Sequence, residues 1–130
     1  MCITGWPFAT EPASAAHATT GRDGVTRVVV LAKEAHAATA NRTVHVTIEL
    51  PCEAPRRTTG ATLLRLAPKA NGLHAVDGIT YAGQTLDGTQ DGHVMGQRIP
   101  ERINSTRQQG SETFAFELAP ASAALLIVAA

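Results

Sequence analysis

Residues 43 to 50 alternate strictly between apolar and polar side chains, and this pattern limits the fold more than any other part of the sequence. The apolar positions are Val44, Val46, Ile48 and Leu50, and the polar positions between them are His45, Thr47 and Glu49. Successive side chains of a β-strand point to opposite faces, so the stretch predicts a strand with one face in a core and the other in water. Pro51, which cannot donate a ladder hydrogen bond, is expected to end it.

Short apolar or alternating segments recur along the chain between Gly, Pro and Asp-Gly pairs. The expected strands are 25–31, 43–50, 63–66, 79–81 (resuming at 84–86), one short strand within 94–99, 113–118 and 123–128. The β-branched run 25–31 predicts a strand buried on both faces or nearly so. Segment 33–41 lacks an apolar stripe and segment 100–111 is polar, so loops and turns are expected there. About seven or eight short strands without an amphipathic helix predict an all-β, antiparallel β-sandwich.

The predicted core combines the inward parities of these strands. Its members are Val44, Val46, Ile48, Leu66, Phe114, Phe116, Leu118, Leu126 and Val128.

The length of 130 residues suits one domain. Residues 1–24 hold two prolines, small side chains and little periodicity, so an irregular or poorly ordered N-terminal segment is expected before a β-sandwich domain at 25–130. The first residues lack the basic and apolar regions of a secretory signal. No stretch approaches the ~20 apolar residues that a membrane-spanning helix requires.

Charge gives no indication of a nucleic-acid partner. Eleven basic residues balance 11 acidic ones, and the arginines are scattered except for Arg56 and Arg57. A nucleic-acid surface would show a clustered basic stripe.

The segment from Asp87 to Gly92 partly matches a calcium-binding EF-hand loop, with oxygen-bearing side chains at positions one, three and five and Gly at six. Position twelve should be Glu and is Arg98, a cation that opposes calcium binding. The two Asp-Gly pairs predict tight turns instead.

Glycoside hydrolysis requires two carboxylates about 5–10 Å apart across one sugar ring. Glu112 and Glu117 lie five positions apart, which places them on opposite faces of one strand. Asp87 and Asp91 lie in a turn without an apolar pocket. These carboxylates are therefore expected to be solvated, and no catalytic residue is assigned.

The remaining candidates are favoured as structural or surface residues. Ser122 lacks the Gly-x-Ser-x-Gly elbow of a nucleophile and is expected to be a packed small residue at a strand start. The cysteines, Cys2 and Cys52, allow a disulfide without indicating one. Asn41 and Asn104 begin glycosylation sequons, which matter only on a secretory route. The five histidines show no paired metal-ligand spacing, so no metal or cofactor is predicted; they are His17, His36, His45, His74 and His93.

Three motifs carry a family resemblance: Leu-Leu-Arg-Leu-Ala-Pro from 63, Gly-Ile-Thr-Tyr-Ala-Gly-Gln from 78, and Leu-Ala-Pro-Ala-Ser-Ala-Ala-Leu-Leu from 118. Together they resemble the C-terminal β-domain of family 79 glycoside hydrolases, the β-glucuronidases and heparanase relatives, over roughly Val25 to Val128.

The resemblance implies a sandwich that packs beside a catalytic (β/α)₈ barrel carrying both catalytic glutamates, one of them after an Asn. This chain has no Asn-Glu dipeptide and is too short for a barrel, which needs at least ~200 residues. The expected function is therefore a non-catalytic accessory domain, with the barrel as partner and with self-association of the isolated chain. A free-standing carbohydrate-binding module or a protein-interaction sandwich stays open as the alternative.

Overall fold

The computed structural model describes residues 14–33, 43–51, 60–68, 75–108 and 110–129. Within these ranges lie nine strands and no helix, which confirms the all-β class. The strands are β1 (Ser14–Thr20), β2 (Thr26–Ala32), β3 (Val44–Pro51), β4 (Gly60–Pro68), β5 (Ile79–Tyr81), β6 (Glu101–Asn104), β7 (Thr106–Gln108), β8 (Ser111–Leu118) and β9 (Ser122–Val128).

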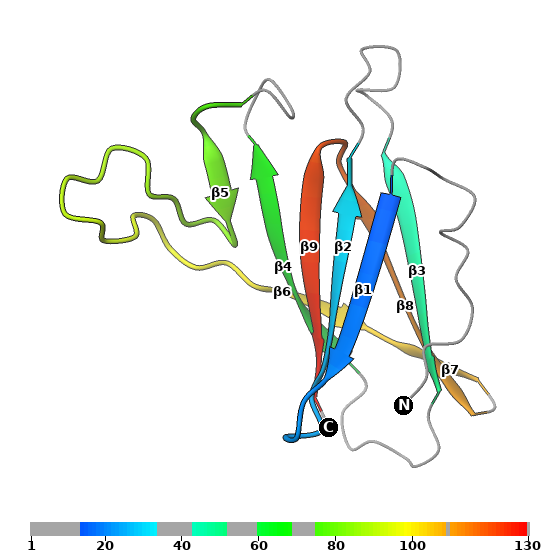
Figure 1. The fold of residues 1–130 in the computed structure, drawn as a ribbon. Helices are drawn as coiled ribbons and strands as arrows, with labels where there is room; N and C mark the ends of the chain where they lie inside the picture. The colour runs from blue at the N-terminus through cyan, green and yellow to red at the C-terminus, as the bar shows by residue number, and fades with distance from the viewer. Residues whose placement is uncertain (1–13, 34–42, 52–59, 69–74, 109, 130) are drawn as a thin grey trace.

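The strands form two antiparallel sheets that face each other. The larger sheet has the order β1-β2-β9-β4-β5, with β6 also paired to β4, and the smaller sheet has the order β3-β8-β7 (Figure 1). Buried side chains of both sheets form one core cluster, including Val30, Leu63 and Leu126 from the larger sheet and Ile48 and Phe114 from the smaller one. The predicted β-sandwich is thus confirmed.

The register expected for residues 43–50 is confirmed. In β3, Val46, Ile48 and Leu50 are buried while the residues between them are exposed. The partner strand matches this parity, because Val46 lies opposite Phe116 and Ile48 opposite Phe114. Seven of the nine predicted core residues are buried, and Val44 is half-buried against the core cluster.

Leu66 is the exception, and its prediction was wrong. It is 42% exposed on the outer face of the larger sheet, opposite Tyr81 on β5. The inward parity of β4 is odd, as the buried Ala61 and Leu63 of the core cluster show. Position 65 therefore points toward the second sheet and position 66 points away from it.

The expectation that 25–31 is buried on both faces was also wrong in part. Burial in β2 alternates, and Val29 on the outer face is 38% exposed. β-Branched residues indicate that a segment forms a strand, but not that both of its faces are buried. The larger sheet packs against the second sheet on one face, so the other face of β2 is partly exposed.

Two segments expected to be irregular contain strands. Residues 14–20 form β1, which pairs with β2 along its whole length, from Ser14 opposite Ala32 to Thr20 opposite Thr26; residues 1–13 lie outside the described ranges. Polar residues 101–104 and 106–108 form β6 and β7. All three strands have a single strand neighbour, and such edge positions need little apolar patterning.

The proposed strand within 94–99 is absent from the described chain, where Met95 makes only an isolated bridge to Thr85. The loop expected at 33–41 lies outside the described residues from position 34 onward, as do Cys2, Cys52, His36, His74 and Asn41.

One edge of β4 is shared by two strands. β6 pairs with residues 60–63, β5 pairs with residues 66–68, and the chain between β5 and β6 leaves this edge and returns to it. We call residues 82–100 the arm; in Figure 1 it projects from the sandwich beyond β5. Its base is fixed by backbone hydrogen bonds from Ala82 N–H to Arg65 O and from Ile99 N–H to Ala82 O, both 2.7 Å.

Candidate functional site

Large exposed apolar side chains gather where the arm meets β4 and β5. Five of them line a hollow of about 400 Å³, together with Gln84, Thr85 and Asp87. The five are Leu66, Ile79, Tyr81, Leu86 and Val94, with exposed fractions between 40 and 59%. Contiguous exposed apolar surface of this kind is typical of an interaction site.

Three polar side chains of the hollow are hydrogen-bonded within the chain. Gln84 Nε2 donates to Gly96 O at 3.3 Å, and Thr85 Oγ1 accepts from Asp87 N–H at 3.1 Å. Asp87 Oδ2 accepts from Gly78 N–H at 2.5 Å. The hollow therefore presents mainly apolar side chains to a ligand, together with the hydroxyl of Tyr81, while Gln84, Thr85 and Asp87 are already hydrogen-bonded within the chain.

The Asp87–Gly92 segment is a pair of turns, as predicted. Gly88 and Gly92 have φ angles of 75° and 80°, the left-handed conformation that Asp-Gly turns require. Asp91 accepts from His93 N–H at 3.1 Å and from Thr89 Oγ1 at 3.0 Å, and His93 Nδ1 lies 2.9 Å from its carboxylate. These contacts hold the pKa of Asp91 below its usual 3.8, and the hydrogen bond from the His93 backbone contributes most.

Glu112 and Glu117 point to opposite faces of β8, as predicted, so they cannot act on one sugar ring together. The expectation that both are solvated was wrong for Glu112, which is 1% exposed and shares the inward parity of Phe114. Its carboxylate accepts a hydrogen bond from Ser105, and Arg107 Nε lies 3.8 Å away.

Ser105 is where the chain passes from β6 in the larger sheet to β7 in the smaller one. Glu112 on β8 therefore holds the β6–β7 connection in place where the chain changes sheets. The signal that could have found it was its even position in β8, which it shares with Phe114 and Phe116.

The other candidates occupy structural or surface positions. Ser122 donates to Ala119 O at 2.5 Å at the start of β9 and is buried, as expected for a packed small residue. His45 is exposed and lies 3.2 Å from the carboxylate of Glu117. His17, His93 and Asn104 are exposed on β1, the arm and β6.

The described residues contain no group of three or more His, Cys, Asp or Glu side chains placed to hold a metal ion. Nor do they contain a helix long and apolar enough to cross a bilayer.

Residues 16–125 match the model of the glycosyl hydrolase family 79 C-terminal beta domain. The match spans most of both sheets, from β1 into β9. The chain belongs to this family. The family 79 resemblance read from the three motifs is thereby confirmed, and the match begins earlier than expected because β1 is part of the domain.

Twelve chains of solved structures resemble this family 79 domain. One is the 4-O-α-L-rhamnosyl-β-D-glucuronidase of Fusarium oxysporum 12S, solved with Rha-GlcA, at 19% identity and a TM-score of 0.55. The similarity covers 87% of this chain and only 26% of that one. At this identity the likeness concerns the fold, and the chain spans about a quarter of that enzyme's length. A search of curated proteins returned no match.

Proposed function

We propose that this domain is a non-catalytic accessory sandwich of a β-glucuronidase-like glycoside hydrolase, and that it packs beside a catalytic (β/α)₈ barrel. The observation that carries the proposal is the family match over residues 16–125, since that family is a C-terminal domain of glycoside hydrolases. The similarity covers only 26% of the Fusarium enzyme, so most of that chain lies outside the region that resembles this domain, as expected for an accessory domain.

The arrangement of carboxylates supports the absence of catalysis. Glu117 is exposed on the outer face of β8 and Glu112 is buried in the corner of the sandwich. The carboxylate of Asp87 accepts a hydrogen bond from the backbone of Gly78, and that of Asp91 accepts one from the backbone of His93 in its own turn. A glycosidase needs an acid and a second carboxylate facing one cleft, and these four residues do not provide that pair.

A carbohydrate-binding module has less support. Such modules present exposed aromatic side chains to sugar faces, and among the described residues Tyr81 is the single exposed aromatic one, because Phe114 and Phe116 are buried.

Two experiments test the proposal. The purified chain should not turn over an aryl β-glucuronide, and activity that disappears on mutating Glu112 or Glu117 would contradict it. The DNA around the coding sequence should encode a family 79 catalytic barrel, either in frame or as a neighbouring gene. The absence of a barrel would contradict the accessory role.

The isolated chain should also self-associate, because the surface meant for a barrel is then exposed. Sedimentation at increasing concentration measures this. A strict monomer at high concentration would favour a self-sufficient domain.

A further inference from the structure

Resting on the proposed function, we propose that the hollow between β5 and the arm is the docking site for an apolar side chain that projects from an outer helix of the catalytic barrel. The inference assigns the contact to one surface of the domain. It also gives the arm a role, as a preformed clamp on one side of that hollow.

The first argument is the composition of the hollow's wall. Leu86 and Val94 on the arm are 59% and 55% exposed, and they face the same hollow as Tyr81 on β5, which is 44% exposed. No basic residue lines it, and its one acidic residue, Asp87, is bonded to the backbone of Gly78. Covering this wall removes apolar surface from water, which is favourable, and the one charged group in it is already hydrogen-bonded to the backbone.

The second argument favours an apolar side chain over a sugar as the occupant. A sugar is recognised through hydrogen bonds to its hydroxyl groups, and buried polar groups left unpaired cost free energy. Besides the hydroxyl of the half-exposed Tyr81, the polar side chains of the hollow are Gln84, Thr85 and Asp87, and each of these three already has a partner in the chain. An apolar side chain leaves those hydrogen bonds intact.

The third argument is that the arm is fixed in shape although it packs little against its own sandwich. Thr85 and Met95 exchange two backbone hydrogen bonds, of 2.9 and 2.8 Å, which close the arm on itself. Gly83 and Gly96 meet at its base, where a Cβ on Gly96 would lie 2.8 Å from Gly83 O. A loop held in its binding shape loses less entropy when it binds, so this rigidity favours docking.

The fourth argument concerns the occupant. A (β/α)₈ barrel presents a ring of α-helices on its outside, so a domain that packs beside it meets helical side chains. The remaining three-quarters or so of the Fusarium chain shows that the fold occurs with a much larger partner region in one polypeptide. The hollow, at about 400 Å³, is large enough to take an apolar side chain from such a helix.

The test uses the full chain and the barrel found in its genomic context, produced as separate polypeptides. Titration calorimetry compares the wild type with Leu86→Asp and Val94→Asp. Each variant should raise the Kd at least about tenfold, as expected for a side chain at the centre of an interface. Val29→Asp is the matched control. Val29 is an exposed valine on β2, and two strands, β9 and β4, separate β2 from β5 in the larger sheet.

The outcomes separate this inference from the proposed function. If the wild type binds and both arm variants bind equally well, the docking site is wrong while the accessory role stands. If the wild type does not bind the barrel, the accessory role fails and the inference fails with it. If added glucuronic acid shifts the methyl NMR resonances of Leu86 and Val94, the occupant of the hollow is a sugar and the proposed docking of the barrel is wrong. If the chain does not bind the barrel but self-associates, and Val94→Asp abolishes that self-association, the occupant of the hollow is a second copy of this chain.

Discussion

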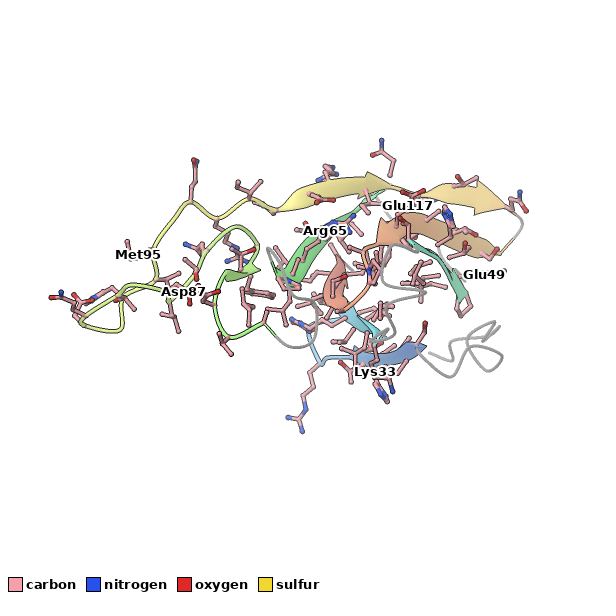
Figure 2. All side chains as sticks on the ribbon, turned by 90° about the horizontal axis from the view of Figure 1, so that it is seen from above. Lys33, Glu49, Arg65, Asp87, Met95 and Glu117 are labelled. Atoms are coloured by element: carbon pink, nitrogen blue, oxygen red, sulfur yellow. The ribbon has the colours of Figure 1, made fainter. Side chains whose placement is uncertain are left out.

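The side chain of Arg65 on β4 donates a hydrogen bond to the main-chain carbonyl of Glu117 on β8 and so joins the two sheets of the sandwich. Its Nε also donates to Glu101 Oε1 on β6, at 2.7 Å. Arg65 and Glu117 are both labelled in Figure 2, and the side chain of Glu117 itself lies exposed on the outer face of β8. One planar guanidinium thus binds a carboxylate on its own sheet and a carbonyl on the opposite one.

Replacing Arg65 should loosen this connection. We expect Arg65→Met to lower the free energy of unfolding by about 1–2 kcal/mol, because one carbonyl bond and a partly exposed ion pair are lost. Arg65→Lys should recover less than half of the loss, since an ammonium group cannot reproduce the fork of the guanidinium. Urea unfolding measures both. Arg98→Met, on an exposed arginine of the arm, should change stability by less than about 0.5 kcal/mol.

Glu112 should matter for stability although it lies on a strand face expected to be apolar. Glu112→Ala removes the acceptor of the Ser105 hydrogen bond and leaves a cavity at the corner of the sandwich. We expect a loss of about 2–4 kcal/mol in thermal or urea unfolding. Glu117→Ala on the exposed face of the same strand is the control, at about 0.5 kcal/mol or less. Equal losses would mean that Glu112 does not fix the corner.

Phe116→Ala should destabilise the core by about 3 kcal/mol, the low end of the range for aromatic truncation, because the ring is 8% exposed. The exposed Thr47 lies on the other parity of the paired strand, so Thr47→Ala should cost much less. Chemical denaturation compares them. A loss below about 0.5 kcal/mol for Phe116→Ala would remove this ring from the core.

Gly96→Ala should disorder the base of the arm without unfolding the sandwich. Its φ of 91° is unfavourable for an L side chain, and the added Cβ would collide with Gly83 O. Hydrogen exchange of the Thr85 and Met95 amides should accelerate, while amides of β8 and β9 keep their protection. Gly88→Ala is the matched control, because its φ is 75° but the space around it is open. It should have the smaller effect.

Asp91 should titrate below its usual pKa of 3.8. A lowered pKa in the folded chain means that the carboxylate contributes stability above the unfolded value, and that this contribution is lost as the pH falls through the folded value. Carboxyl ¹³C NMR measures the midpoint, with the urea-unfolded chain as reference. Thr89→Ala removes one of the donors and should move the midpoint up toward 3.8. A midpoint equal to the unfolded one would contradict the turn geometry.

Much of the fold followed from local sequence. Alternation at 43–50 and 113–118 determined two strands and their buried faces, because a half-buried strand needs one apolar parity. The Asp-Gly pairs likewise determined turns at 87–92, since Gly accepts a positive φ. The three motifs determined the family.

Only the tertiary structure determined the strands and the buried or exposed positions that do not follow the apolar–polar alternation of the sequence. β1, β6 and β7 carry weak apolar signals because their stability comes from backbone pairing with one neighbour. Leu66 looked like core and lies on the outer face of the larger sheet, because packing against the second sheet decides which face of β4 points inward. Glu112 looked like surface and is buried, because the corner at Ser105 supplies a hydrogen bond to its carboxylate. The arm and its hollow also arise from the tertiary structure: β5 and β6 share one edge of β4, so the nineteen or so residues between them must project outward, and no local pattern encodes that sharing.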